Sequence, residues 1–386
     1  MAETKTNPES ETGQLFTHAA LYQQSLRSFL GPVVSLLDDD SVSEIMVNGP
    51  NDIYCERAGK LERTEMRFPT PEHVMAAATN IADFVGREFN EDHPSTDARL
   101  PDGSRVHLLM PPASRAGVCI TIRKFKKAGF GIEQLVQWGS LSPEAADFVR
   151  FAVRSHKNII VAGGTGTGKT SLLNALSEAI DPSERVIVIE DSSELQLVQP
   201  HVLYLETQPP RANGLGGMGI RDLFVASLRM RPDRIVVGEV RRGEALDLVQ
   251  SMLSGHAGSL ATVHASTTRD TLTRLETLCL MSDVALPVYV ARAQVASAID
   301  LVVQLARFGN GSRRVVAISE VLPLGPAQEY RFLDLYTLRP DATADKSGDT
   351  THSLQWTGVK SECMDPSLNV GIDFRTLPEN LRKLVE

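Results

Sequence analysis

The sequence has 386 residues, of which 42% are hydrophobic and 23% are charged. This composition is that of a globular protein, and it excludes wholesale disorder, collagen-like chains and coiled coils. At about 150 residues per domain, the length predicts two or three domains. The net charge of −9 disfavours nonspecific nucleic-acid binding by the chain as a whole, because such binding needs a basic surface.

Neither a membrane span nor a signal peptide is predicted. The longest weakly polar stretch, residues 285–306, still contains Arg292 and Asp300. The first 20 residues are polar and lack an apolar region behind a basic start. The four cysteines lie far apart with no C-x-x-C pair, so neither a disulfide framework nor a zinc site is predicted. We therefore expect a cytoplasmic protein.

The first third of the chain predicts a small domain of mixed structure. Residues 1–18 are polar with little to bury, which predicts a disordered tail. Strand-like runs then follow one another with tight-turn signals at Asn48-Gly49 and Ala58-Gly59, and Pro71 opens a helix. We expect an α+β N-terminal domain over residues 19–125. Residues 126–141 contain three glycines and suit a connector.

From residue 142 the pattern changes to alternating strands and helices. Ser142-Pro143 is a good helix start, and later strands are almost entirely apolar, as in Ile159-Ile160-Val161. Such alternation predicts βαβ units, with helices on both faces of a sheet, over residues 142–324. After residue 324 the signal weakens into short strand-like pieces, and no role is predicted for residues 325–386.

The strongest motif follows the first apolar strand of this region. Its residues fit G-x-x-x-x-G-K-[ST]: Gly163, Gly164, Thr165, Gly166, Thr167, Gly168, Lys169 and Thr170. Backbone N–H groups of such a loop, and of Ser171 after it, bind phosphate oxygens at a helix N-terminus. Lys169 would reach the β- and γ-phosphates, and Thr170 would hold Mg²⁺. The sequence therefore predicts a nucleotide site here.

Three polar residues follow other apolar strands. Glu239 ends residues 234–238, Glu190 ends residues 186–189, and His264 ends residues 260–263. The carboxyl ends of parallel strands meet at the ligand-binding edge of a sheet. Glu239 and Glu190 are therefore candidates for supporting the metal or water, and His264 is a candidate for binding phosphate. Solvated acids and a histidine bound to local backbone are the structural alternatives.

Phosphoryl transfer also favours a guanidinium near the transferred group. The candidate arginines fall in two groups, one before the Glu239 strand and one in the N-terminal domain: Arg221, Arg229 and Arg231, and Arg99, Arg105 and Arg123.

In their order, the motifs resemble the secretion ATPase superfamily of type II secretion, type IV pili and type IV secretion, over about residues 30–320. They are the phosphate-binding loop, an acidic box at 189–195, Val237-Gly238-Glu239, and a histidine box at 255–265. Four segments resemble the CpaF-like tight-adherence (Tad/Flp) pilus ATPases: SEIMVNG at 43–49, DARLPDGSRV at 97–106, TIRKF at 121–125 and LRMRPDR at 228–234. Conjugation ATPases of type IV secretion are the next most similar.

The resemblance implies a RecA-like P-loop NTPase domain behind the α+β domain, in a homohexamer that hydrolyses ATP with Mg²⁺. It implies catalytic roles for Lys169, Glu190, Glu239 and His264, and for Arg105 and Arg123. Thr170 and Glu239 would hold the metal. The implied partner is an inner-membrane platform protein, reached from the cytoplasmic face by peripheral association, and no nucleic acid is expected. A nucleic-acid translocase and a nonhydrolytic nucleotide sensor are the alternatives.

Overall fold

The computed structural model describes residues 22, 24–57, 59–125, 130–210, 214–340, 352–365, 369 and 377–385. The predicted tail at 1–18 and residues 126–129 of the predicted connector lie outside these ranges. The chain divides into two compact units, Met1–Lys127 and Ala128–Glu386. Within the described ranges, no helix combines the length and the apolar character that crossing a bilayer requires.

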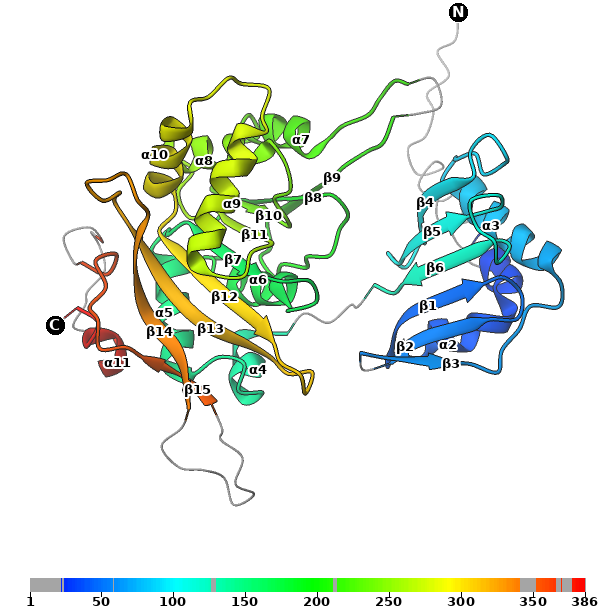
Figure 1. Ribbon diagram of the computed structural model, residues 1–386, viewed down its shortest axis with the longest axis horizontal. Coiled ribbons are helices and arrows are strands. Elements are labelled where there is room, and N and C mark those ends of the chain that lie inside the picture. Colours follow the sequence, from blue (N-terminus) through cyan, green and yellow to red (C-terminus); the bar gives the residue numbers. More distant parts are fainter. Residues whose placement is uncertain are drawn as a thin grey trace, which may run out of the picture. The chain divides into compact units, whose positions relative to one another are not determined.

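The first unit is built on a six-stranded antiparallel sheet with the order β3-β2-β1-β6-β5-β4 (Figure 1). The strands are β1 (Val42–Asn48), β2 (Ile53–Arg57), β3 (Lys60–Arg63), β4 (Ser95–Arg99), β5 (Arg105–Leu109) and β6 (Cys119–Arg123). The short helices η1 (Gly31–Val33) and α2 (Val34–Asp38) precede them, and α3 (Pro71–Phe84) lies between β3 and β4. Helix α3 buries Val74, Ala78 and Ile81 at helical spacing in the core of this unit.

The second unit is built on a nine-stranded sheet with the order β15-β14-β13-β12-β7-β11-β10-β8-β9 (Figure 1). Six neighbouring strands are parallel: β12 (Leu301–Arg307), β7 (Ile159–Gly163), β11 (Leu260–Val263), β10 (Arg234–Val237), β8 (Val186–Glu190) and β9 (Val202–Glu206). Three antiparallel strands continue the sheet beyond β12: β13 (Arg313–Leu322), β14 (Arg331–Pro340) and β15 (His352–Trp356).

Helices cover both faces of this sheet, as predicted. Alternate residues of β7 enter different cores: Ile159 and Val161 enter one, and Ile160 and Ala162 enter the other. Four helices pack in the first core: α4 (Ile132–Gln137), α5 (Pro143–Arg154), α6 (Lys169–Ser177) and α11 (Glu379–Arg382). Four others pack in the second: α7 (Ile220–Ser227), α8 (Glu244–Leu253), α9 (Thr268–Leu280) and α10 (Val288–Ala298). This arrangement is a RecA-like P-loop NTPase fold.

Segments on either side of the predicted 142–324 region contribute to the same core. Ile132 and Leu135 of α4, within the predicted connector, are buried with residues of α5 and α6. Past residue 324, β14 buries Tyr336 beside Phe148 of α5, with ring centroids 5.7 Å apart. Leu354 of β15 packs in the same core. The described residues after 324 therefore complete the sheet of the second unit.

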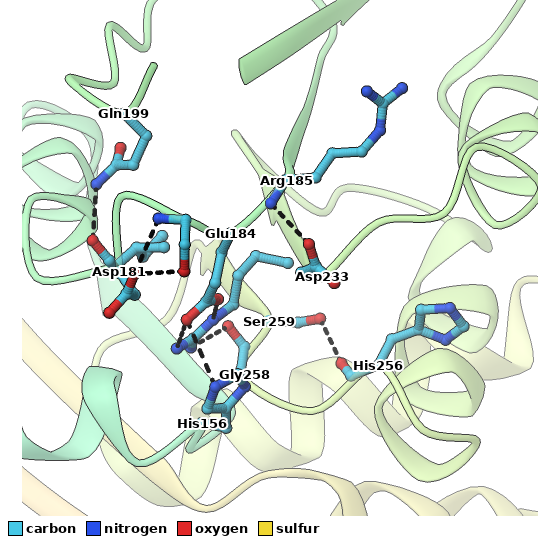
Figure 2. A network of polar contacts seen from close by, with 12 residues as sticks. His156, Asp181, Glu184, Arg185, Gln199, Asp233, His256, Gly258 and Ser259 are labelled. Atoms are coloured by element: carbon cyan, nitrogen blue, oxygen red, sulfur yellow. Dashed lines mark hydrogen bonds and ion pairs between the residues drawn. The ribbon is translucent and has the colours of Figure 1, made fainter. Parts of the chain in front are cut away.

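A buried ion pair ties together the amino ends of the central strands. The side chain of Arg234, at the start of β10, is fully buried and pairs with the carboxylate of Glu184. Its Nη1 also donates to the carbonyl of Gly258, at 3.1 Å. Figure 2 shows the Glu184 carboxylate beside Gly258 and His156, whose Nε2 lies 3.5 Å from Oε1 of Glu184. These contacts fix the strand edge opposite the phosphate-binding loop.

Candidate nucleotide site

The phosphate-binding loop joins β7 to α6 through a turn that requires glycine. Gly166 and Gly168 have φ angles of 69° and 94°, in the left-handed region that disfavours other residues. A Cβ at Gly163 would lie 2.5 Å from Oγ1 of Thr167 and 3.0 Å from the carbonyl oxygen of Leu305. The loop therefore closes tightly over the start of α6, whose first N–H groups have no partner within the helix.

The lysine of the motif is folded back onto its own loop. Nζ of Lys169 donates to the carbonyls of Gly163, at 3.1 Å, and Gly164, at 2.9 Å. The residue is 8% exposed, and burial lowers the pKa of its ammonium group, an effect that the nearby Glu239 carboxylate opposes. An arriving phosphate would replace the two carbonyls as the partner of this cation.

Glu239 and His264 lie at the same edge of the sheet, because they follow β10 and β11, which are parallel neighbours, and β11 in turn pairs with β7. Nε2 of His264 lies 2.8 Å from Oε1 of Glu239. The two ring nitrogens lie 3.3 and 3.4 Å from Nζ of Lys169. Burial and the Lys169 charge lower the pKa of His264. The structure thus brings together three predicted residues from three separate segments.

Arg241, which the sequence analysis did not identify, extends this group. Its Nη2 lies 2.6 Å from Oε2 of Glu239, and its Nη1 lies 3.2 Å from Oδ2 of Asp191. A chain of contacts therefore runs from Asp191 through Arg241, Glu239 and His264 to Lys169. Arg241 lies two residues beyond a strand-end acid, and that position is the only sequence signal for it.

Glu190 is placed differently from the other predicted acids. Its side chain is 3% exposed, and its Oε1 accepts the N–H groups of Glu194, at 2.9 Å, and Leu195, at 3.1 Å. A Cβ on Gly238 would lie 2.8 Å from its Cγ. In this structure Glu190 therefore organises the turn after β8 and packs beside the residue that precedes Glu239.

A pocket of about 230 Å³ opens beside the phosphate-binding loop. Thr167, Gly168 and Ser171 line one side, and Phe130 and Trp138 lie among the lining residues from the segment around α4. The two aromatic rings meet edge to face, with centroids 4.6 Å apart. An apolar, partly aromatic slot next to a phosphate-binding loop has the character of a nucleobase site.

A second arginine missed by the sequence analysis also touches the loop. Nε of Arg313, at the start of β13, donates to the carbonyl of Gly166, at 2.9 Å. Arg313 also lines the pocket. The antiparallel half of the sheet therefore contacts the nucleotide site directly.

The predicted N-terminal arginines lie in one row of the first unit. Across the antiparallel strands, Arg99 is opposite Arg105, Arg105 is opposite Arg123, and Arg123 is opposite Glu44. Directly opposite residues point to the same face of a sheet. Nε of Arg123 lies 3.7 Å from Oε1 of Glu44. Arg105 and Arg123 thus share one face with Arg99.

The remaining candidates lie away from the loop. Arg221 pairs with Asp247 and Asp283, at 3.1 and 2.6 Å. Arg229 and Arg231 precede β10 and are therefore at the amino edge of the sheet. His256, in the histidine box at 255–265, precedes β11 at that same edge, where its carbonyl accepts a hydrogen bond from Oγ of Ser259 (Figure 2).

The donor set at the loop fits a magnesium ion. Thr170, in the first turn of α6, offers a hydroxyl, and Glu239 offers a carboxylate. Both are hard oxygen ligands of the kind that Mg²⁺ prefers, and Mg²⁺ needs few protein ligands when phosphates complete its coordination.

A G-x-x-x-x-G-K-T loop between a parallel strand and a helix, with an acid and a histidine at the neighbouring strand ends, defines a P-loop NTPase. Comparison with known proteins identifies the family. Residues 28–331 match the type II/IV secretion system protein family. The chain therefore belongs to this family, and it is an ATPase of type II/IV secretion and pilus systems.

Several relatives are similar over most of their length. A putative conjugal transfer protein of Mycobacterium tuberculosis is 32% identical over 295 residues, which cover 75% of this chain and 83% of that protein. The type IV secretion system protein PtlH homolog of Bordetella bronchiseptica is 36% identical over 308 residues, covering 72% and 90%. The solved structure of the pilus retraction motor PilT with bound ADP shares the fold, with a TM-score of 0.56 at 17% identity, over 78% of this chain and 84% of that one.

Proposed function

We propose that this protein is a hexameric, Mg²⁺-dependent motor that hydrolyses ATP to drive pilus assembly or protein secretion across the bacterial cell envelope. The observation that carries the proposal is the meeting of Lys169, His264 and Glu239 at the phosphate-binding loop. A helix N-terminus and a lysine can bind the phosphates, and a strand-end carboxylate can orient the attacking water. Magnesium held by Thr170 and Glu239 would neutralise charge on the β- and γ-phosphates.

Each side chain has a distinct part in this reaction. Lys169 leaves the carbonyls of Gly163 and Gly164 for the phosphate oxygens, because an anion is a stronger partner for an ammonium than a neutral carbonyl. His264 pairs with Glu239 and contacts Lys169, so its surroundings change when Lys169 moves to the phosphate oxygens. The pocket beside Trp138 takes the base, which stacks on the aromatic side chains.

The arginine row of the first unit would supply positive charge to the phosphates. Arg105 and Arg123 project from neighbouring strands onto one face, so one anion can meet both guanidinium groups. In a ring of subunits this face would close over a nucleotide site, and closure would convert phosphate binding into motion. The hexamer would work at the cytoplasmic face of the inner membrane, on a membrane-bound platform protein.

For the particular system we favour tight-adherence pilus assembly, on the motifs at 43–49, 97–106 and 121–125. The alternative is a conjugation-type type IV secretion ATPase. It is supported by the similarity to the conjugal transfer protein of Mycobacterium tuberculosis and to PtlH.

The test is phosphate release by the purified protein with ATP and Mg²⁺, with and without single-stranded DNA. We expect release that DNA does not stimulate and that Lys169→Ala abolishes, while the exposed-lysine variant Lys360→Ala retains it. Stimulation by DNA would favour the translocase, and binding without release would favour the nucleotide sensor. Sizing with light scattering in ATP analogue and Mg²⁺ should give six subunits.

A further inference from the structure

The guanidinium of Arg241 lies between the carboxylates of Glu239 and Asp191, and the backbone of Arg241 is held by a third carboxylate. Its backbone N–H, like that of Arg242, donates to Oε1 of Glu244, at 2.7 and 2.8 Å. Glu244 is 8% exposed and begins α8, so the loop after β10 is anchored by a buried acid. From this anchor Arg241 reaches Oε2 of Glu239 at 2.6 Å.

The two oxygens of Glu239 therefore have different partners. Oε2 is paired with Arg241, and Oε1 is paired with Nε2 of His264. Together these contacts fix the rotamer of the carboxylate. Because each oxygen has its own partner, the orientation of the Glu239 carboxylate is fixed as well as its distance from Arg241.

Lys169 is the other cation beside this carboxylate, with only the His264 ring between them. Within the described part of the chain, the Lys169 ammonium has no carboxylate within 4.0 Å, and its partners are carbonyls and the imidazole. A lysine bound to neutral groups is easily transferred to a phosphate. A lysine bound to a carboxylate in a half-buried site is not easily transferred to a phosphate, because the ion pair must first be broken.

We propose that Arg241 is a positioning residue that holds Glu239 away from Lys169 and so keeps the lysine available for nucleotide. Without Arg241, the nearest cation for the half-buried Glu239 is Lys169. The rotamer would turn toward it, and the resulting ion pair would compete with phosphate for the ammonium group. This inference rests on the proposed function, since it assigns Lys169 to the phosphates.

The experiment measures the dissociation constant of ADP by calorimetry on the full chain. Arg241→Gln should weaken ADP binding at least about fivefold, a loss of about 1 kcal/mol. Arg241→Lys should restore most of the affinity, because it keeps the positive charge beside Glu239. Arg242→Gln, which removes a positive charge one residue further along the chain, should bind ADP with the affinity of the wild type. Thermal melts establish that each variant is folded.

The decisive variant is the double substitution Arg241→Gln with Glu239→Gln. It removes the carboxylate that would capture Lys169, so its ADP affinity should return to that of Glu239→Gln alone. A double variant as weak as Arg241→Gln would overturn the proposal, since it would mean that Arg241 contacts the nucleotide or supports the fold. Wild-type affinity in Arg241→Gln would overturn it as well. If the wild type itself binds no ADP, the proposed function fails instead.

Discussion

Gly258 leaves the space that the buried guanidinium of Arg234 occupies, because a Cβ at position 258 would lie 2.2 Å from Nη1 of Arg234. Gly258→Ala should therefore displace Arg234 from Glu184 and lower the free energy of unfolding by about 3–5 kcal/mol, the range for breaking a buried pair. Urea denaturation of the purified protein measures the change.

The matched control is Gly255→Ala. Gly255 belongs to the same loop and also has a positive φ, 108°, but a Cβ there meets nothing within 4 Å. The free energy of unfolding of this variant should fall only by the cost of a strained backbone, about 1–2 kcal/mol. Equal losses in the two variants would show that the Arg234 contact contributes nothing beyond backbone strain.

Glu239→Gln should keep its affinity for ATP and lose hydrolysis. The amide is the same size as the carboxylate, but it cannot accept a proton from water or ligate Mg²⁺ in the same way. We expect turnover to fall at least ~10²-fold, measured by phosphate release, with little change in the dissociation constant. Glu206→Gln, at the end of the edge strand β9, is the control and should retain turnover. Loss of ATP binding in Glu239→Gln would make Glu239 a structural residue.

Trp138 should report nucleotide binding by its fluorescence. The chain has two tryptophans, and Trp138 lines the pocket beside the loop, whereas Trp356 lies in β15. Adding ADP to Trp356→Phe should change the emission, because stacking on the base alters the surroundings of the indole. Trp138→Phe should show no change. An emission change in Trp138→Phe but not in Trp356→Phe would mean that the base does not bind in this pocket.

Arg105→Ala and Arg123→Ala should each reduce turnover at least ~10-fold, roughly 1.4 kcal/mol of barrier, while the ring persists in light scattering. Arg67→Ala, an exposed arginine of the same unit, is the control and should leave turnover unchanged. Mixing Arg123→Ala with Lys169→Ala subunits tests whether Arg123 acts on the nucleotide of its own subunit or on that of a neighbouring subunit. Activity reappears only if the arginine serves a neighbouring subunit, and full activity in both arginine variants would contradict the role.

Glu320 should make the stability of the ATPase unit depend on pH. It is 2% exposed, and it accepts hydrogen bonds from Oγ of Ser361, at 2.9 Å, and from N of Glu362, at 3.0 Å. Burial nevertheless raises the pKa of this carboxyl. The folded protein thus binds the proton more tightly than the unfolded chain, whose carboxyl titrates near ~4.3. The stabilisation is complete below that pH and is lost as pH rises through the native pKa.

Glu320→Gln does not titrate, so it isolates this effect. The difference in free energy of unfolding between the variant and the wild type should shift in favour of the variant as pH rises from about 4.5 to 8. Urea denaturation at several pH values measures it, with Glu379→Gln, an exposed carboxylate of the same unit, as control. A difference that stays constant with pH would contradict the raised pKa.

The parts of the site that sequence predicts are those with a local pattern. Lys169 belongs to a motif, and Glu239 and His264 follow short apolar runs that are typical of buried parallel strands. Arg241 and Arg313 have no such pattern, because an arginine in a loop shows its role only through what the fold places beside it. Glu190 shares the strand-end position of Glu239, yet its oxygens face the backbone of its own turn.

The fold was predictable to a similar degree. The central parallel strands β7, β8, β10 and β11 follow the predicted apolar runs nearly residue by residue, because each is a short apolar run between turn signals. Helix α10 and strand β12 were not predicted, because together they form one weakly polar stretch without a clear period: β12 is buried on both faces, and α10 exposes Val288 and Tyr289. Strand β4 was missed because its sequence, Ser95–Arg99, is polar, as is common for a strand at a sheet edge.

The antiparallel strands also determine where the chain can be cut. Strand β13 is paired along most of its length with β14, and β14 buries Leu335 and Tyr336. A fragment that ends at residue 324 would leave β13 as a long unpaired edge with an uncovered apolar face. Such an edge pairs readily with a second chain and leads to aggregation. Recombinant fragments that stop at residue 324, where the predicted alternation of strands and helices ends, would therefore misassociate, whatever the state of their nucleotide site.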